Sequence, residues 1–156
     1  MRYLGALLVA LSAFVAASAQ SRQSCNFVCD GDTLKQDGTT YRLEAFDAPE
    51  ADQTCDGGAW HPGPLAKQAL ADFIAGRPVE CRPITIDRYG RTVARCYAGG
   101  ADLSMLMVAA GWGWAFRRYS VELVSVEEEA KAKGLGVHAH DCVPAWEWRA
   151  RNRGVR

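Results

Sequence analysis

Acidic side chains and one arginine, Arg42, are concentrated in residues 28–50, in two short strand-like runs joined by polar turns. Glycine in the DGDT segment lets the backbone turn sharply between Asp30 and Asp32. If the runs pair as a hairpin, Asp32 and Asp47 lie at the same end of a sheet, where two carboxylates would repel each other unless a cation lies between them. Oxygen donors suit a hard ion such as calcium or magnesium. The stretch therefore predicts a metal site, although acids beside glycine are also common turn residues.

A second charged segment, DRYGR at 87–91, adds another arginine to this potential chemistry. A planar guanidinium meets two phosphate oxygens in a fork and keeps its charge, so Arg42 and Arg91 are suited to binding a phosphate group. Attack of water on a phosphodiester adds negative charge at the phosphoryl oxygens and needs a base that orients the water. Each arginine also has a simpler interpretation. Arg42 could be a surface residue, and Arg91 a turn residue that pairs with Asp87.

The hydrophobic pattern predicts the elements that must position these residues. Asp-Gly at 37–38 is typical of a hairpin turn. Apolar residues at helical spacing follow Pro64, and Asp102 is expected to cap a second, shorter helix. The expected order is paired strands within residues 28–47, a helix over 64–75, a strand hairpin over 78–97, and helices over 103–110 and 121–133. This order describes an α+β chain with a small barrel.

The C-terminal part of the chain is predicted to contribute core-packing and surface residues rather than catalytic ones. Aromatic residues alternate within 112–116, so at least one face of that run is expected in the core. Two Glu–Lys pairs at i,i+4 spacing within 127–133 indicate a solvated acidic face on the last helix. Trp146 and Trp148 are expected to hold the tail against the body. The arginine-rich residues 149–156 are expected to fray.

Residues 1–19 have the composition of a secretory leader. Arg2 precedes an apolar run, and Ala-Ser-Ala at 17–19 matches a small-residue cleavage site. The run is short for a membrane span. We therefore expect a secreted or periplasmic protein without stable membrane association after cleavage, and a retained anchor is the alternative. Without the leader, 17 basic and 18 acidic residues remain, so any phosphate recognition must be local rather than due to bulk positive charge.

The rest of the chain is one domain by length, and a hydrophobic content of 49% is sufficient for a core. We divide it into the leader 1–19, a folded domain over 20–148 and a polar tail over 149–156, and we expect a monomer. All six cysteines follow the leader, which argues for disulfides in an exported chain. Cys81 and Cys96 flank the 87–91 turn almost symmetrically, so we expect them to form a bridge.

The other four cysteines allow three pairings, between which the sequence does not choose: Cys25, Cys29, Cys55 and Cys142. A zinc site is the alternative, with Cys25 and Cys29 joined by ligands from the segment 138–142. Its spacings match no common zinc pattern. The chain also has no HExxH motif that would indicate a zinc hydrolase.

Taken together, the segments DGDT, RLEAFDAPE and DRYGR resemble the staphylococcal nuclease (thermonuclease) family, in that order and at compatible spacing. The resemblance covers nearly the whole chain after the leader. It implies a five-stranded OB-type β-barrel with about three helices packed outside it. Such barrels commonly present a face to nucleic acid, although a fold alone does not establish a function.

The resemblance also implies roles for individual residues. Arg42 and Arg91 match the phosphate-clamping arginines of the family, and Glu50, which could otherwise be a plain loop acid, matches its general base. The matching calcium site comprises the side chains of Asp32 and Asp47, the backbone carbonyl of Ala48 and, near the metal, Asp30. Tyr89 and Tyr119 match positions that contact the nucleotide. The long basic loop that precedes the DRYGR-like turn in the family is shortened here.

Two hypotheses follow from different functional classes. The first is an exported, calcium-dependent endonuclease that cleaves DNA and RNA and leaves 3′-phosphate ends. The second is a non-catalytic, disulfide-stabilised OB-type module that binds nucleic acid or another polyanion. A binding-only relative is expected to have lost Glu50 or one of the two arginines. This chain retains all three, which favours the enzyme.

Overall fold

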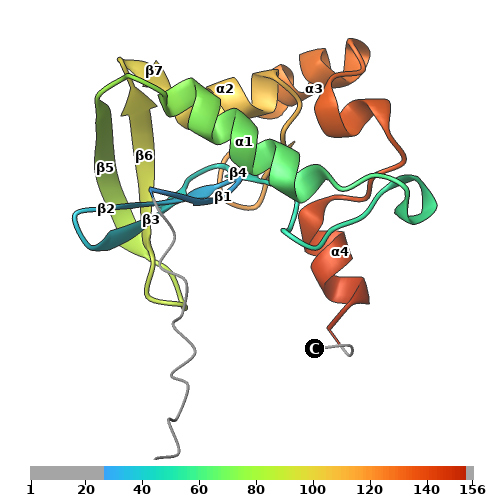
Figure 1. Ribbon diagram of the computed structural model, residues 1–156, viewed down its shortest axis with the longest axis horizontal. Helices are drawn as coiled ribbons and strands as arrows, with labels where there is room; N and C mark the ends of the chain where they lie inside the picture. The colour runs from blue at the N-terminus through green and yellow to red at the C-terminus, as the bar shows by residue number, and fades with distance from the viewer. Residues whose placement is uncertain (1–26, 154–156) are drawn as a thin grey trace, which may run out of the picture.

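The computed structural model describes residues 27–153. The expected leader at 1–19 and Cys25 lie outside the described residues. Within the described part, the chain is α+β, with groups of short strands separated by helices (Figure 1). It also contains two single 3-10 turns, η1 (Asp56–Gly58) and η2 (Gly136–Ala139). No helix in this part is long and apolar enough to cross a membrane.

A curled mixed sheet forms the centre of the fold. Its main path follows the five-strand order β1-β2-β3-β6-β5, and β7 pairs with β6. The contact between β3 and β6 is parallel, and the other pairs are antiparallel. The strands are β1 (Val28–Asp30), β2 (Thr33–Gln36), β3 (Thr39–Leu43), β5 (Val79–Ile86), β6 (Thr92–Ala98) and β7 (Ala101–Asp102). This curled sheet confirms the OB-type α+β fold.

The β2–β3 hairpin determines where the acidic segment lies. Asp37 and Gly38 have φ values of 49° and 80°, the positive values that a two-residue Asp-Gly turn requires. Thr33 pairs with Arg42 in the strand register. The arginine therefore lies beside the turn that carries the first acids.

A second, two-stranded sheet carries Asp47. Its strands are β4 (Phe46–Asp47) and β8 (Trp114–Ala115), with Asp47 opposite Trp114. The residue before β8 is Gly113, and a Cβ there would lie 2.8 Å from the Asp47 carbonyl oxygen. The absence of a side chain at this position therefore lets β8 approach β4.

Two helices, α1 (Pro62–Ile74) and α2 (Leu103–Ala109), pack against the curled sheet, and a third packs against α2. Figure 1 shows α1 lying across β1–β3, while α2 contacts β6 and α1. The third, α3 (Val124–Ala132), contacts α2 and β8. The Asp102 carboxylate accepts the Met105 N–H at 3.1 Å and caps α2 as expected. Large fully buried side chains fill the space between the layers: Leu34, Leu43, Phe46, Leu70, Leu103 and Met107.

The C-terminal part differs from the sequence prediction in two ways. A fourth α-helix, α4 (Ala145–Arg151), includes residues that were expected to fray. Arg149 of this helix forms ion pairs with Asp47 and Glu50, which attach the helix to the rest of the fold. The acidic face of α3 is also not uniformly solvated. Glu127 is only 3% exposed, and its carboxylate lies 2.9 Å from Lys131 Nζ.

Disulfides join segments that are distant in sequence. Cys81 and Cys96 are directly opposite each other in β5 and β6 and form the expected bridge. Cys55 and Cys142 link the loop before α1 to the segment before α4, a pairing that the sequence could not select. Cys29 is also disulfide-bonded. No cysteine within residues 27–153 is free, so the zinc interpretation is wrong for the thiols of this part of the chain.

Candidate active site

Arg42 joins the two carboxylates at the centre of the site. Its Nη1 lies 2.8 Å from Asp32 Oδ2, and its Nη2 lies 2.9 Å from Asp47 Oδ1. The same two nitrogens also donate to the carbonyls of Leu43 and Phe46, at 3.0 and 3.1 Å. Because the Asp47 side chain is only 2% exposed, water screens this contact little. The fold therefore brings the two predicted acids together, with a guanidinium between them.

A backbone N–H and a side-chain hydroxyl orient the Asp32 side chain. Its Oδ2 accepts the Ala48 N–H at 3.2 Å, and its Oδ1 accepts the Thr33 hydroxyl at 2.9 Å. Asp30 lies alongside and accepts the Asp32 N–H at 3.1 Å. Burial and the negative charge of Asp32 raise the pKa of Asp30 to about 7. This corner of the site therefore concentrates negative charge.

Glu50 joins the cluster through Arg149, an arginine for which the sequence analysis predicted no role in the site. Arg149 Nη1 donates to Glu50 Oε1 at 2.6 Å and to Asp47 Oδ1 at 3.2 Å, and Nη2 donates to Asp47 Oδ2 at 2.7 Å. Burial alone would lower the pKa of Arg149. The hydrogen bonds and charges of Asp47 and Glu50 outweigh burial and raise it above its ordinary value, so the side chain stays cationic.

Two neighbours fix the backbone of Glu50. Gln53, which is fully buried, accepts the Glu50 N–H through Oε1 at 3.1 Å and donates from Nε2 to the Val143 carbonyl at 2.8 Å. Gly63 in the first turn of α1 lies against the same segment, and a Cβ there would be 2.3 Å from the Glu50 carbonyl oxygen. The loop that carries Glu50 is thus held between α1 and the segment that leads into α4.

Arg91 reaches the cluster from the turn between β5 and β6. Its Nε donates to Asp87 Oδ2 at 2.7 Å. Arg91 therefore does pair with Asp87, as expected if it were only a turn residue. Its Nη1 also donates to the Thr33 hydroxyl at 3.4 Å, and Thr33 in turn contacts Asp32. Burial tends to raise the pKa of Asp87, but hydrogen bonds from Arg91 and Tyr89 outweigh it and keep that pKa below its usual range. Arg91 therefore has a structural partner and a link to the acids.

The two predicted substrate-binding tyrosines are both exposed. Tyr89 is 67% exposed, and the Arg91 guanidinium lies 5.6 Å from the centre of its ring. Tyr119 is 74% exposed and packs against Phe116, which stacks on Trp146 of α4. The structure thus brings Tyr89 next to a predicted phosphate ligand. It connects Tyr119 to the site only through the aromatic residues beside α4.

The acids fit a hard cation by the chemistry of their donors. Asp32 and Asp47 are both buried and offer only oxygens, and one guanidinium spans the distance between them. A small cation with the carbonyl of Ala48 could take that place. Within residues 27–153 no group of three or more His, Cys, Asp or Glu side chains forms a metal-binding cluster. What the described residues offer is therefore two neighbouring carboxylates, Asp32 and Asp47, with the backbone of Ala48 beside them.

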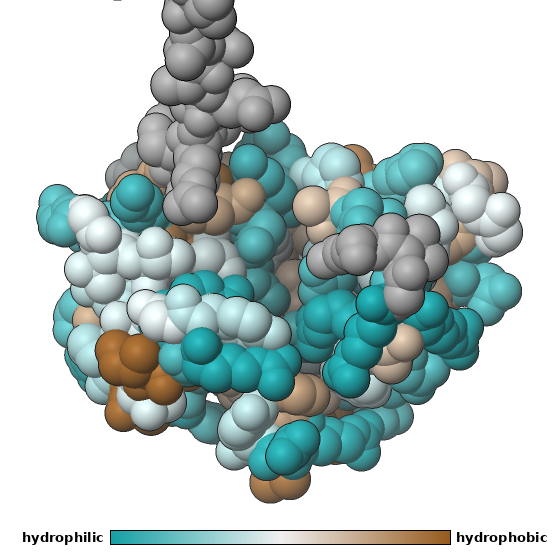
Figure 2. Space-filling view, turned by 90° about the horizontal axis from the view of Figure 1, so that it is seen from below, coloured by the Kyte–Doolittle hydropathy of each residue, from teal (hydrophilic) through white to brown (hydrophobic). Residues whose placement is uncertain are grey.

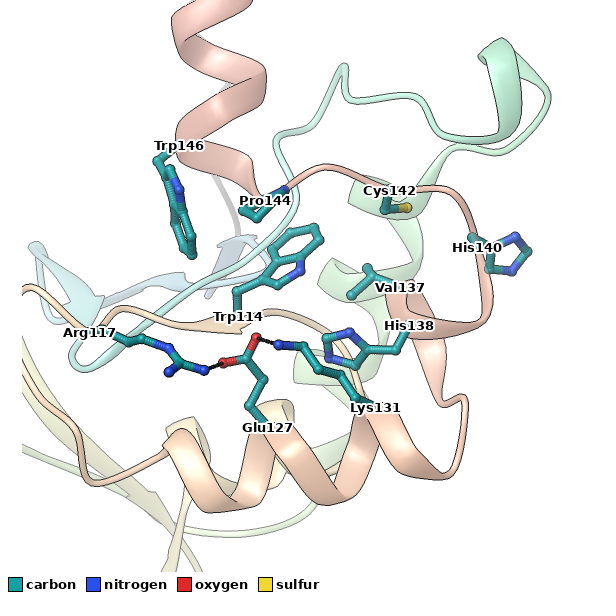
Figure 3. A pocket seen from close by; sticks show the side chains of 10 residues that line it. All are labelled: Trp114, Arg117, Glu127, Lys131, Val137, His138, His140, Cys142, Pro144 and Trp146. Carbon is teal, nitrogen blue, oxygen red and sulfur yellow. Dashed lines mark ion pairs between the residues drawn. The ribbon is translucent and has the colours of Figure 1, made fainter.

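A cavity of about 390 Å³ lies apart from these residues, between α3 and the segment before α4 (Figure 3). Trp114 and Trp146 line it, and Glu127 pairs there with Lys131 and Arg117. His138 Nε2 and one Glu127 oxygen are buried there and have no hydrogen-bond partner among residues 27–153. The cavity contains neither predicted arginine and neither predicted metal ligand. We therefore assign the candidate chemistry to the Asp–Arg cluster.

Three residues of the site were not identified from the sequence. Thr33 lies inside the DGDT segment, where its hydroxyl could have been read as a link between an acid and an arginine. Gln53 gave no signal, because a buried glutamine cannot be distinguished from a loop glutamine without the fold. Arg149 follows Trp146 and Trp148, and two tryptophans near a chain end could have indicated that the tail is packed.

Comparison with known proteins identifies the family of this chain. The family model described as "Staphylococcal nuclease homologue" matches residues 40–140. The chain is similar to a protein of Shigella flexneri named "Micrococcal nuclease", with 33% identity over 127 residues that cover 73% of this chain and 69% of the relative. It is also similar to an "Uncharacterized endonuclease" of Haemophilus influenzae, with 29% identity over 120 residues, 72% of this chain and 64% of the relative.

The chain thus spans about two thirds of the length of these curated relatives. The matched region contains β3 to β8, including Arg42, Asp47, Glu50 and Arg91. The motifs, the curled sheet and both comparisons agree. The protein belongs to the staphylococcal nuclease family.

Proposed function

We propose that this protein is a metal-dependent endonuclease that hydrolyses phosphodiester bonds in DNA and RNA. The observation that carries the proposal is one continuous series of ion pairs and hydrogen bonds. It runs through Arg91, Thr33, Asp32, Arg42, Asp47, Arg149 and Glu50. This series gathers cations for a phosphate, carboxylates for a metal ion and one carboxylate for a water molecule. The names of the relatives support the same class of activity.

In this proposal Arg91 and Arg42 bind the phosphate. Arg91 is 30% exposed, and its Nη2 has no acceptor among residues 27–153, so it can donate to a substrate. The Arg42 guanidinium donates hydrogen bonds to the carbonyls of Leu43 and Phe46 and to Asp47, and its Nη1 also forms an ion pair with Asp32. We therefore expect Arg42 to turn to the phosphate when a cation shares Asp32 and Asp47.

Glu50 is the proposed general base. Its side chain is about one quarter exposed, at 26%, so a water molecule can reach it from solvent. An ionised carboxylate held by an arginine is suited to orient that water and accept its proton during attack on phosphorus. Asp32, Asp47 and the carbonyl of Ala48 are the proposed calcium ligands, and Asp30 supports them from behind. When bound, such an ion polarises the phosphoryl group and favours ionisation of a water molecule.

Substrate contact is proposed to be local. Tyr89 and Tyr119 offer exposed rings on which bases can stack; Tyr89 lies beside Arg91, and Tyr119 packs against Phe116. Figure 2 views the molecule from the side where the β5–β6 turn and the end of α4 lie, and most of that face is hydrophilic. Recognition through phosphate and stacking gives little sequence preference. We propose cleavage of both DNA and RNA that leaves 3′-phosphate ends.

The disulfides support the proposal that the enzyme is exported. Bridges such as Cys55–Cys142 and Cys81–Cys96 form and persist in oxidising compartments. Together with the leader-like residues 1–19, they support a secreted or periplasmic enzyme. We propose that it acts there as a monomer that is not bound to the membrane.

The test is cleavage by the purified chain without residues 1–19. We would incubate it with single-stranded DNA and with RNA, in calcium, in magnesium and in chelator, and identify the chemical group at the new ends. A Glu50→Gln variant is the matched control. We expect cleavage that depends on calcium, leaves 3′-phosphates and is lost in the variant. Binding of the polymers without cleavage under any of these conditions would instead support the non-catalytic module.

A further inference from the structure

Arg149 is the one charged residue of the cluster to which neither the motifs nor the family resemblance gives a role. It follows Glu50 by 99 residues and Asp47 by 102 residues, on the last turn of α4. Its guanidinium donates to three carboxylate oxygens at 2.6 to 3.2 Å. One partner, Asp47, is 2% exposed. The contact is therefore not a solvent-screened surface ion pair of the kind that contributes little.

The start of α4 is fixed to the loop that carries Glu50. The attachments are covalent, hydrogen-bonded and aromatic, and they all join residues 53–60 to residues 140–143. They are the Cys55–Cys142 disulfide, the Gln53–Val143 hydrogen bond, the contacts of Asp56 with His140 and Asp141, and the stacking of Trp60 on His140. The loop and the lead-in to α4 thus form one unit, so Arg149 is placed relative to Glu50 before any substrate binds.

This attachment argues against a removable plug. A segment that blocks a site and then leaves it needs weak contacts along its length. Here the lead-in is held by a disulfide, and Trp146 in the first turn of α4 stacks on Phe116 at 5.5 Å. The Arg149 side chain also remains 36% exposed. Solvent can therefore reach the carboxylates while the arginine is in place.

We propose that Arg149 is a positioning residue, whose guanidinium sets the orientation of the Glu50 carboxylate and occupies Asp47 until a cation replaces it there. The inference rests on the proposed function, because it assumes that Glu50 is the base and Asp47 a metal ligand. Both Asp47 oxygens accept a hydrogen bond from Arg149. A metal ion and Arg149 must therefore compete for this carboxylate, while Glu50 remains bound to the arginine.

Loss of Arg149 should change two measurable quantities in opposite directions. The Glu50 carboxylate loses the only ion pair that the structure gives it within residues 27–153, so the turnover number should fall. The two metal-ligand acids lose a nearby positive charge and a competitor, so they should bind calcium more tightly. General damage to the fold would instead weaken both catalysis and calcium binding.

The experiment compares Arg149→Ala and Arg149→Lys with Arg151→Ala in the chain without residues 1–19. Arg151 lies two residues further along the same helix, and its ion pair is to Glu147 on that helix, so it is the matched control. We would measure kcat and KM on single-stranded DNA, calcium affinity by calorimetry, and the melting temperature. The Arg149→Ala assay would be repeated with added guanidinium ion at a concentration that does not denature the protein.

For Arg149→Ala we expect kcat to fall by about 10- to 100-fold, the usual effect of losing a residue that orients a site, with little change in KM. Calcium should bind more tightly, guanidinium should restore part of the activity, and Arg149→Lys should retain more activity than Arg149→Ala. Arg151→Ala should match the unsubstituted protein. Unchanged kcat in Arg149→Ala, or a loss of activity that follows the melting temperature and is not restored by guanidinium, would overturn the proposal. If the unsubstituted protein cleaves nothing, the proposed function fails as well.

Discussion

Gln53 donates a hydrogen bond from Nε2 to the carbonyl of Val143 at 2.8 Å, across a sequence separation of 90 residues. The other end of the same amide accepts the N–H of Glu50. The buried Gln53 side chain therefore connects the loop of the proposed base to the segment that leads into α4.

Replacing Gln53 with leucine should weaken both folding and catalysis. The substitution leaves the partly buried Glu50 N–H and Val143 carbonyl without the Gln53 partner, and a fully buried unpaired group costs about 1–3 kcal/mol. We expect the free energy of unfolding in urea to fall by about 1–3 kcal/mol in total and kcat to fall because Glu50 loses its support. The control is Gln68→Leu, since Gln68 is exposed on α1 and contacts only Asp72 within the described chain. Equal stability of the two variants would show that the Gln53 bridge is unimportant.

Gly63→Ala tests the close approach of α1 to Glu50. A Cβ at this position would lie 2.3 Å from the Glu50 carbonyl oxygen and 2.8 Å from Ala51 Cα. Because both neighbours are backbone, the loop must move. We expect destabilisation of about 1–3 kcal/mol, as for other overpacked positions, together with reduced activity. Leu65→Ala, at a half-exposed position of the same helix, is the comparison, and nuclease assays on both variants after thermal melts provide the measurement.

Arg91→Ala should reduce catalysis and leave the fold intact. The side chain is partly exposed, and its removal takes a charged donor away from the place where negative charge develops. The expected loss in kcat is about 10²- to 10³-fold, as for other oxyanion donors. Arg88→Ala is the control, because Arg88 contacts the exposed Tyr89 on the same turn. A folded Arg91→Ala protein with full activity would remove Arg91 from the proposed mechanism.

Asp32→Ala tests the proposed metal site. Asp32 is buried, and its carboxylate is a candidate ligand beside Asp47. Its loss should raise the calcium concentration needed for half-maximal activity and weaken calcium binding measured by calorimetry. Asp52→Ala, on the exposed loop that follows Glu50, changes the same net charge and should have a much smaller effect. An unchanged calcium response in Asp32→Ala would exclude Asp32 as a ligand.

His138 predicts a dependence of stability on pH. Burial lowers its pKa in the folded protein below the ordinary value of 6.5, so the unfolded chain binds a proton more readily than the folded chain. The contribution of neutral His138 to the free energy of unfolding should therefore be fully present above about pH 6.5. It should decrease as the pH falls from there towards the lowered pKa of the folded protein. His138→Gln should flatten this part of a plot of unfolding free energy against pH. His61→Gln, at an exposed position, should not.

The sequence was most informative where chemistry and turn geometry are local. The Asp-Gly turn at 37–38, the Asp102 cap and the two opposed cysteines of the β5–β6 hairpin each depend on residues close in the chain. Family motifs selected Arg42, Asp32 and Asp47, which the structure brings into contact. Their roles in catalysis remain predictions.

The contacts that were not predicted depend on distant parts of the chain. Arg149 resembles any arginine of a polar tail until α4 brings it to Glu50. Glu127 has the spacing of a solvated helix acid, but it is only 3% exposed and borders a cavity that Trp114 and His138 also line. In both cases the surroundings of a charged side chain depend on segments other than its own helix.

The Cys55–Cys142 bridge has a consequence for where this protein can work. Its two halves belong to the two segments whose alignment places a guanidinium against the proposed base. Under reducing conditions that alignment would depend on hydrogen bonds and ring stacking alone, and the α4 lead-in could separate from the loop. A chain in which this bridge has not formed would then carry the proposed catalytic groups without a fixed arrangement, so activity would wait for oxidation of the two thiols.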